Sequence, residues 1–434
     1  MSYVVILIAL AVHIAVTAEH SFASGLAVKS AWVQIAPPHV AIVRALTVDS
    51  TCPEVRFDKR TERMVERAAA DSDFNILTCE AAVPPGTHSI EVGGRNLRPP
   101  VARPQRIAVI GDTGCRLKAG GSLDDGFQAC NNPDDWEFAK VARQVAAWSP
   151  DLIIQVGDFI YREQACAEPG CEGSPFNSPG MRLETWDADY FTPAAPMLEA
   201  APIVFVRGDH EQCERAGKGF FRFLDPFPLR ECLDFSDPYA LDFDGLRLVV
   251  MDTVQAGDTA ALLSPEVVIE RYRQDFDRAK RLASRDTWLV SHRPIWGIRP
   301  TVGDGSGVEV LNVTVQRALS GPLPDVVDLV LTGHIHLAEV LNFTGGRPAQ
   351  VIVGTGGTRL LPEITKDVVG MEINGEFVTR ATVRSTHGFI TFQPERDHTW
   401  QMTIRNAMGG EVAVCRLANK SVICPADQGS QGSQ

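Results

Sequence analysis

The stretch IVFVRGDHE, residues 203–211, decides the fold. It begins as an apolar run, passes through a glycine and ends in three side chains that can carry charge or bind a metal. Two earlier stretches have the same form, IAVIGD at 107–112 and DLIIQVGD at 151–158. A short apolar run bounded by a turn residue is typical of a buried strand. The chain therefore predicts several buried strands whose ends carry acidic groups.

Helical patterns separate these runs. Residues 134–148 and 264–283 show the spacing of amphipathic helices, and further apolar runs follow in DTWLVSH, DVVDLVLTGHIH and VIVGTGG. Largely apolar strands that alternate with helices indicate an α/β sheet covered on both faces. The pattern after residue 369 is again strand-like.

The ends of the chain differ from this middle part. Residues 26–98 read as short strands separated by Pro, Gly and Asp, which predicts a small β-rich N-terminal domain. Residues 99–106 are predicted to be a linker, and residues 107–405 the α/β domain. Residues 406–434 are predicted to be a C-terminal tail with one pair of cysteines.

Composition excludes one class of partner. The chain has 434 residues, of which 44% are hydrophobic and 22% charged, and its net charge is −13. This charge argues against nucleic-acid binding through a basic face. A phosphate-bearing substrate would need a local positive site.

The first residues predict export. Residues 3–18 are mostly apolar but shorter than a membrane span of about 20 residues, and the small residues Val16 and Ala18 allow cleavage by a signal peptidase. We interpret residues 1–23 as a signal peptide with cleavage after residue 18 or 23. A membrane anchor or a buried strand is the alternative. No later segment is long and apolar enough to span a membrane, so the expected location is secreted or periplasmic.

The cysteines agree with export. There are ten, and they fall into sequential couples with short gaps and no C-x-x-C pair. The simplest hypothesis is five local disulfides in an oxidising compartment. These are Cys52–Cys79, Cys115–Cys130, Cys166–Cys171, Cys213–Cys232 and Cys415–Cys424.

Side chains that could bind metal gather at the ends of the predicted strands, where sites of α/β proteins are usually built. A single Gly-Asp is most often a structural turn, and a single His is most often a core group. Five such strand ends in one chain indicate a metal site instead. The residues are Asp112, Asp158 with Tyr161, Asp209 with His210, His292, and His334 with His336.

These motifs resemble the calcineurin-like metallophosphoesterase family, whose signature is D-x-[H/G], GDxx, GN[HD], a lone His and GHxH. Here they read GDTG, GDFIY, GDHE, LVSH and GHIH. Gly114 takes the place of a ligand His, and Tyr161 lies three residues after Asp158, as in the purple acid phosphatase branch. The resemblance implies a four-layer α-β-β-α sandwich, preceded by the small N-terminal β-domain.

The resemblance also implies a ligand set. Asp112, Asp158, Tyr161 and His336 would bind one metal ion, and Asp158, Asp209, His292 and His334 a second. A hard phenolate with carboxylates suits Fe(III), and imidazoles suit Zn(II), Fe(II) or Mn(II). In such a site a metal-bound hydroxide attacks phosphorus.

Three further roles are expected. His210 would bind a phosphate oxygen or protonate the leaving alcohol. Asp209 is counted with His210 as a catalytic residue, and Glu211 is a candidate to orient the His210 ring. Arg293 is the candidate phosphate-binding cation, and Arg299 is the alternative. The family's Asn is replaced here by Asp209.

Three functions fit these features. The leading one is a secreted hydrolase of small phosphomonoesters that uses two metal ions. A phosphodiesterase or nucleotide hydrolase on the same fold is the second, and a metal-binding surface protein with little catalysis is the third.

Overall fold

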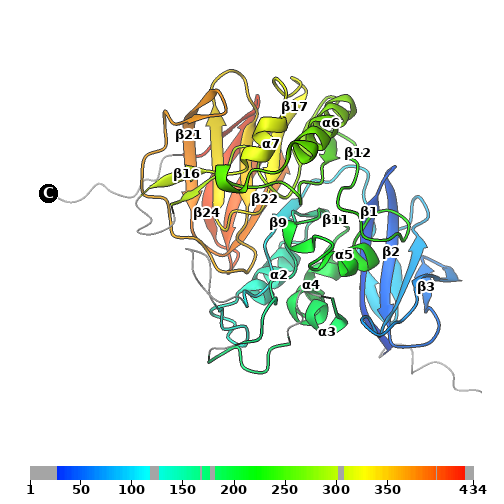
Figure 1. Cartoon of the computed structure of the whole chain (residues 1–434). Helices are drawn as coiled ribbons and strands as arrows, with labels where there is room; N and C mark the ends of the chain where they lie inside the picture. The colour runs from blue at the N-terminus through cyan, green and yellow to red at the C-terminus, as the bar shows by residue number, and fades with distance from the viewer. Residues whose placement is uncertain are drawn as a thin grey trace, which may run out of the picture.

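Two large β-sheets form the body of the molecule (Figure 1), in a computed structural model that describes residues 27–117, 127–166, 169–175, 181–301, 307–396 and 398–425. The first sheet has the strand order β25-β24-β23-β22-β9-β10-β11-β1-β2-β6-β5. The strands in its centre, β9, β10 and β11, run parallel. Its strands are β1 (Val28–Ala36), β2 (Val40–Thr47), β5 (Val65–Ala68), β6 (Leu77–Ala82), β9 (Ile107–Ile110), β10 (Leu152–Gln155), β11 (Ile203–Phe205), β22 (Gly388–Pro394), β23 (Trp400–Asn406), β24 (Glu411–Ala418) and β25 (Ser421–Ile423).

The second sheet has the order β12-β13-β14-β17-β19-β18-β21-β20, with β13, β14, β17 and β19 parallel. Its strands are β12 (Tyr239–Phe243), β13 (Leu246–Val250), β14 (Thr287–Val290), β17 (Val327–Thr332), β18 (Ala338–Phe343), β19 (Ala349–Val353), β20 (Glu372–Ile373) and β21 (Glu376–Arg384). The remaining described strands form two small sheets. One has the order β4 (Arg60–Arg63), β3 (Glu54–Phe57), β7 (Ile90–Val92) and β8 (Arg95–Leu97). The other is the hairpin of β15 (Ile298–Pro300) and β16 (Val308–Val310).

The two large sheets pack face to face. Val109 and Ile154 of the first sheet share one buried cluster with Val250, Val290 and Leu331 of the second. Val109, Ile154, Val290 and Leu331 come from apolar runs that the sequence predicts to be buried strands, whereas the strand of Val250, β13, was not predicted. The core between the sheets therefore fixes the strand ends of both sheets relative to each other.

Helices cover the outer face of each sheet. The first is covered by α2 (Phe138–Ala147), α4 (Thr192–Ala200) and the short elements α3 (Leu183–Trp186), η1 (Asp187–Phe191) and α5 (Gly217–Phe223). The second is covered by α6 (Glu266–Leu282) and α7 (Val313–Ala318). Two single turns, η2 (Asp209–Glu211) and η3 (Ala260–Leu262), complete the helices. This arrangement confirms the predicted α-β-β-α sandwich.

The sequence of α6 explains its position. Ile269, Tyr272, Phe276 and Ala279 are buried, and they recur every three or four residues. This is the spacing of one face of an α-helix, so the helix lays that face on the sheet and leaves its charged face to solvent. The predicted helices at 134–148 and 264–283 are confirmed with slightly shorter bounds.

The N-terminal region is β-rich, as predicted, with strands β1 to β8 and an apolar cluster of its own. It also joins the first large sheet, because β1 pairs in parallel with β11, Gln34 lying opposite Ile203. Buried Arg44 donates to the carbonyls of Phe223 (2.7 Å) and Asp225 (2.8 Å), at the end of α5. The division of the chain into domains stays a prediction.

The predicted tail from residue 406 needs a correction. Residue 406 is the last of β23, and β24 and β25 extend the first sheet by antiparallel pairing. The stretch EVAVCRLA forms β24, which lies between β23 and β25 and alternates in burial over its second half, and the prediction did not recognise this strand. Residues 426–434 lie outside the described residues.

All five predicted disulfides are present. Within the described residues, no helix is both long enough and apolar enough to cross a membrane. The predicted signal peptide, residues 1–23, lies outside the described part of the chain.

Candidate metal centre

The carboxyl ends of five central strands meet at one edge of the sandwich. Asp112 follows β9, Asp158 follows β10, and Asp209 follows β11 in the first sheet. His292 follows β14 and His334 follows β17 in the second sheet. Because the sheets face each other, the side chains from both reach the same space.

The turns at these strand ends have unusual backbone geometry. Asp112, Asp158 and His334 have positive φ angles of 57°, 55° and 73°. A non-glycine residue seldom adopts this conformation, and such positions cluster at functional sites. Gly157 also has a positive φ angle, of 98°, and a Cβ there would lie 2.5 Å from Nδ1 of His292. Both its backbone conformation and its surroundings therefore require glycine.

The first cluster surrounds the hydroxyl of Tyr161. This oxygen lies 2.7 Å from Oδ2 of Asp158, 3.1 Å from Oδ1 of Asp112 and 3.0 Å from Nε2 of His336. All four side chains are buried. They are the four residues predicted to bind the first ion.

The second cluster lies on the other side of Asp158. Nε2 of His292 is 3.2 Å from Oδ2 of Asp158 and 3.1 Å from Oδ1 of Asp209. Nδ1 of His334 is 3.0 Å from the same oxygen of Asp209. One potential ligand atom from each of these four residues lies within 4.8 Å of the others. Asp158 therefore belongs to both clusters.

Backbone carbonyls orient two of the histidines. Nδ1 of His292 lies 2.7 Å from the carbonyl oxygen of Val156, and Nδ1 of His336 lies 2.9 Å from that of Arg359. This contact fixes the tautomer, so the Nε2 lone pair of each ring is directed into the clusters. The rings are arranged as metal ligands usually are.

The charges of the site also fit a cation. Burial, opposed by His292 and reinforced by Asp158, raises the pKa of Asp112 to about 7. Burial also opposes ionisation of Asp209, but Arg293 and His334 outweigh it and hold the pKa of that carboxyl well below its usual range. Buried carboxylates in such proximity are costly unless they are paired or bind metal.

A cavity of about 260 Å³ opens over these clusters. Its lining is mostly polar and contains three arginines. The lining residues are Arg116, Asp158, Tyr161, Asp209, His210, Arg215, Asp258, Arg299, Leu311, His334, Ile335, His336 and Leu361.

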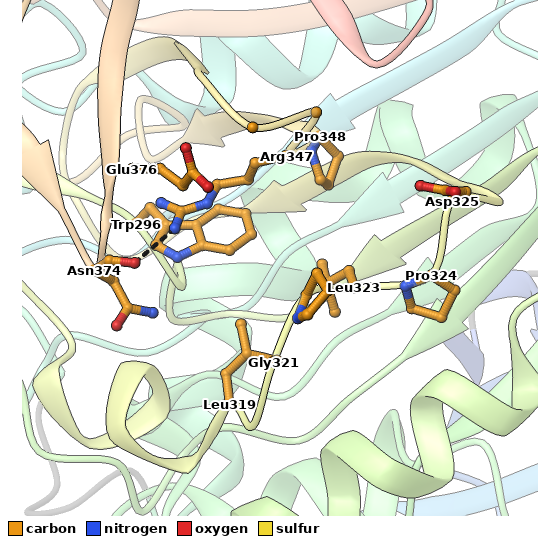
Figure 2. Close-up of a pocket in the computed structure, with 13 residues that line it drawn as sticks. Trp296, Leu319, Gly321, Leu323, Pro324, Asp325, Arg347, Pro348, Asn374 and Glu376 are labelled. Atoms are coloured by element: carbon orange, nitrogen blue, oxygen red, sulfur yellow. Dashed lines mark hydrogen bonds between the residues drawn. The ribbon is translucent and has the colours of Figure 1, made fainter.

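A larger cavity, of about 730 Å³, lies elsewhere (Figure 2). Its wall includes Leu323 to Asp325, which precede β17, whereas His334 follows that strand, so this cavity is at the opposite end of the sheet. Arg347 lies across the indole of Trp296 there, 4.3 Å from the ring centroid. Its described lining contains no histidine, so the smaller cavity is the candidate active site.

A family model described as calcineurin-like phosphoesterase matches residues 105–338, which is more than half of the chain. The chain belongs to the calcineurin-like phosphoesterase family. It is therefore a hydrolase of phosphate esters.

Two solved structures show the same fold. A purple acid phosphatase isolated from yellow lupin (Lupinus luteus) seeds has a TM-score of 0.56 and 13% identity, over 88% of this chain and 73% of that chain. A structure titled PhoD has a TM-score of 0.55 and 12% identity, over 95% of this chain and 94% of that chain. At these identities the likeness concerns the fold alone. No curated protein matches.

In this phosphoesterase His210 lies against the first cluster. Its ring centroid is 3.8 Å from that of Tyr161, and its Nε2 is 3.9 Å from Oδ2 of Asp158. Its Nδ1 is 3.0 Å from Oε1 of Glu163 and 2.6 Å from Nη2 of Arg215. Burial opposes ionisation of Glu163, but His210 and Arg215 outweigh it and lower the pKa of Glu163 to about 2.

The expectation that Glu211 orients His210 is wrong. The Glu211 carboxylate accepts hydrogen bonds from the backbone N–H groups of Gly208 (3.0 Å), Asp158 (3.1 Å) and Phe159 (2.9 Å). Its side chain turns back under the two strand ends because these buried N–H groups have to be satisfied. Glu211 therefore joins the turn after β11 to the turn after β10.

The arginines that stand in or near the motifs, Arg162, Arg207, Arg293 and Arg299, lie in three different settings. Arg293 is buried between carboxylates, with Nη2 3.2 Å from Oδ2 of Asp209 and an ion pair to Asp258. Arg162 pairs with Asp189, and Arg207 pairs with Asp252, away from the cavity lining. Arg299 lines the cavity while its Nε is 2.6 Å from Oε1 of Glu309.

Sequence reasoning missed four residues of the site: Arg116, Glu163, Arg215 and Asp258. One of them had a signal, since Gly257-Asp258 is another Gly-Asp pair. It was overlooked because it does not follow an apolar run directly. The other three are charged residues in loops, which sequence alone does not direct toward any site.

Proposed function

We propose that this phosphoesterase hydrolyses small phosphomonoesters with two metal ions, in the manner of the purple acid phosphatase branch. One observation carries the proposal. The Tyr161 hydroxyl lies among Asp112, Asp158 and His336, and the same Asp158 oxygen also borders the cluster of His292, His334 and Asp209. A tyrosine at this position favours a hard ion such as Fe(III) in the first cluster.

The residues present fit two ions. Asp112, Asp158, Tyr161 and His336 would hold the first, and Asp158, Asp209, His292 and His334 the second. The expected second ion is Zn(II), Fe(II) or Mn(II), because imidazole ligands suit these metals. When bound, the ions supply an activated water and neutralise the charge of the phosphate group.

The protein's own groups position the substrate and move a proton. Glu163 and Arg215 hold His210 by its Nδ1 side, and His210 lines the cavity. His210 would give a proton to the leaving oxygen of the ester or donate to a phosphate oxygen. Arg116, Arg215 and Arg299 bring positive charge to a cavity lining that also contains Asp158, Asp209 and Asp258. With these carboxylates neutralised by bound metal ions, the arginines would favour an anionic substrate in spite of the net charge of −13.

The role of Arg293 in substrate binding stays a prediction. Its guanidinium contacts Asp209 and Asp258, and it is not among the residues that line the cavity. Arg299, the alternative weighed from the sequence, does line it. This placement favours Arg299 for contact with phosphate.

The cavity supports a monoester over a diester. Its volume of about 260 Å³ is below the 300–1,000 Å³ typical of drug-sized ligands, and Leu311, Ile335 and Leu361 are its only apolar lining among the described residues. A second bulky ester group would find little apolar surface. Export is part of the proposal, and the five disulfides support it.

The test compares p-nitrophenyl phosphate with bis(p-nitrophenyl) phosphate, together with metal analysis and a visible spectrum of the same sample. We expect two ions per chain, turnover mainly of the monoester, and a phenolate-to-iron absorption band that Tyr161→Phe removes. Preferred turnover of the diester would replace the proposal by the phosphodiesterase reading. Bound metal without turnover of either compound would favour a metal-binding protein.

A further inference from the structure

The two oxygens of the Asp209 carboxylate face different partners. Oδ1 faces Nε2 of His292 at 3.1 Å and Nδ1 of His334 at 3.0 Å. Oδ2 faces two guanidinium groups, with Nη2 of Arg293 and Nη1 of Arg215 each at 3.2 Å. Only Oδ1 is therefore on the side of the proposed metal ligands.

Arg293 is held in this position from several sides. It is 7% exposed, and its backbone N–H donates to Oγ1 of Thr253 at 2.9 Å. Its Nη1 forms an ion pair with Asp258. Since Arg293 directly follows His292 in the chain, its backbone has little freedom to move away.

Asp258 contacts the second cluster at two points. Besides Arg293, its Oδ1 lies 3.0 Å from Nε2 of His334, the ring nitrogen that faces away from Asp209. Nη1 of Arg293 also lies 3.0 Å from this nitrogen, but a guanidinium can only donate, so the Asp258 carboxylate is the one of these two neighbours that can accept a proton from Nε2. With the proton held on Nε2 by Asp258, Nδ1 carries the free lone pair. Asp258 comes from the loop after β13, which carries none of the ligands.

We propose that Asp258 is a positioning residue for the second metal ion. It orients His334 with Nδ1 toward the ion and places Arg293 against Oδ2 of Asp209, so that Asp209 offers Oδ1 alone. This inference rests on the proposed two-ion function. It assigns a role to a residue that belongs to none of the metal-binding motifs.

The charges around the second cluster indicate in which direction loss of Asp258 changes the binding of the second ion. The Arg293 guanidinium brings a positive charge to the second cluster, where it would repel a bound cation. The Asp258 carboxylate cancels that charge at the point of contact. Replacing Asp258 alone removes one of the two carboxylates that pair with Arg293 and so adds positive charge beside the ion, whereas replacing both residues removes that added charge but not the loss of orientation.

The experiment measures metal per chain after dialysis of the full-length protein against increasing concentrations of a chelator. We expect Asp258→Asn to weaken retention of the second ion by about 10–100-fold, the usual effect of removing a partner of a metal-ligating histidine, while the first ion stays bound. Adding Arg293→Gln should recover part of that loss. Full recovery would reduce the role of Asp258 to charge alone and overturn its positioning role.

Glu309→Gln is the matched control. It also removes a carboxylate paired with an arginine of the same cavity, Arg299, and within the described residues Glu309 is paired with none of the proposed ligands. Its metal retention should equal that of the parent protein. If Asp258→Asn behaves like Glu309→Gln, the inference is wrong, even where the parent binds two ions and hydrolyses phosphate esters.

A folding defect is detected by thermal melts with excess chelator present. If Asp258→Asn melts well below the parent there, Asp258→Glu replaces it, since this variant keeps the charge and displaces the carboxylate. We expect weaker retention of the second ion in Asp258→Glu also, and retention equal to that of the parent overturns the inference. A parent protein that retains metal but lacks esterase activity contradicts the proposed function and leaves this test intact.

Discussion

His210 and Asp209 are neighbours in the chain but face different tasks. The Asp209 carboxylate turns toward His292 and His334, whereas the His210 ring packs on Tyr161 and is held by Glu163. The short turn η2 separates the two directions. Adjacent polar residues after a buried strand can thus serve metal binding and proton transfer at once.

The role of His210 in proton transfer predicts a dependence on the leaving group. An alkyl alcohol leaves poorly without a proton, whereas p-nitrophenolate leaves readily. We expect His210→Ala to lower kcat/KM by about 10²–10⁴-fold for an alkyl phosphate and by less for p-nitrophenyl phosphate. Steady-state kinetics on both esters measure this. An equal loss on both would show that His210 positions phosphate instead.

The turns after the strands carry the site at the scale of elements. The turn after β10 and the turn after β11 are in direct contact, since a Cβ at Gly208 would lie 2.2 Å from the backbone nitrogen of Asp158. Glu211 links the same two turns by hydrogen bonds. The glycines of the Gly-Asp pairs therefore allow the strand ends to approach closely enough for their carboxylates to meet.

This packing predicts the effect of a methyl group at Gly157. Gly157→Ala places a Cβ against Nδ1 of His292 at φ +98°, whereas Gly94→Ala, at φ +77°, meets nothing within 4 Å. Both substitutions strain the backbone, but only the first forces atoms apart, at an added cost of about 1–3 kcal/mol. Chemical denaturation should show a larger loss for Gly157→Ala. Equal losses would mean that backbone strain alone matters and that the turns are not closely packed.

Local pattern explains which elements could be predicted from the sequence. The apolar runs before Asp112, Asp158 and Asp209, and the periodicity of 264–283, are local signals, so the strands and α6 were predicted correctly. The pairing of β1 with β11 joins residues far apart in the chain and leaves no such signal. Strand β24 was missed because its burial alternates only over its second half, so the sequence carries a weak strand pattern there.

The difference between local signals and long-range contacts also explains which residues of the site could be predicted. The ligand candidates were found because each stands in a motif at a strand end, and the structure brings all seven together. Glu163 was missed because a charged loop residue gives no direction for its side chain, and Asp258 was missed because its Gly-Asp pair does not directly follow an apolar run. Glu211 was misjudged because its proximity to His210 in sequence does not show that backbone N–H groups would claim its carboxylate.

At the scale of the whole molecule, the sandwich encloses a buried acid that is not among the residues lining the candidate active site. Glu339, on β18, is fully buried, and its Oε1 has no hydrogen-bond partner among the described residues. Burial raises the pKa of Glu339 well above its usual value, against a weak contribution from the N–H of Ile298. A raised pKa in the folded state means that this carboxyl contributes stability at low pH, which is lost as pH rises through its folded pKa.

This sign predicts a stabilising substitution. Glu339→Gln resembles the protonated acid at every pH, so we expect it to raise the melting temperature at pH 8 and to have little effect near pH 4. Glu372→Gln, an exposed position on β20 of the same sheet, is the control and should change neither value. Thermal melts of the three proteins between pH 4 and pH 8 measure this effect. If Glu339→Gln raises the melting temperature at pH 4 as much as at pH 8, the buried carboxyl of Glu339 does not have the raised pKa expected from its burial.

The proposed function requires two metal ions, one on either side of Asp158. The most direct measurement is anomalous X-ray scattering from a crystal of the protein purified without chelator. We predict two peaks about 3.5–4 Å apart, one beside Tyr161 and His336 and the other beside His292 and His334. A single peak, or metal bound away from Asp158, would contradict the account.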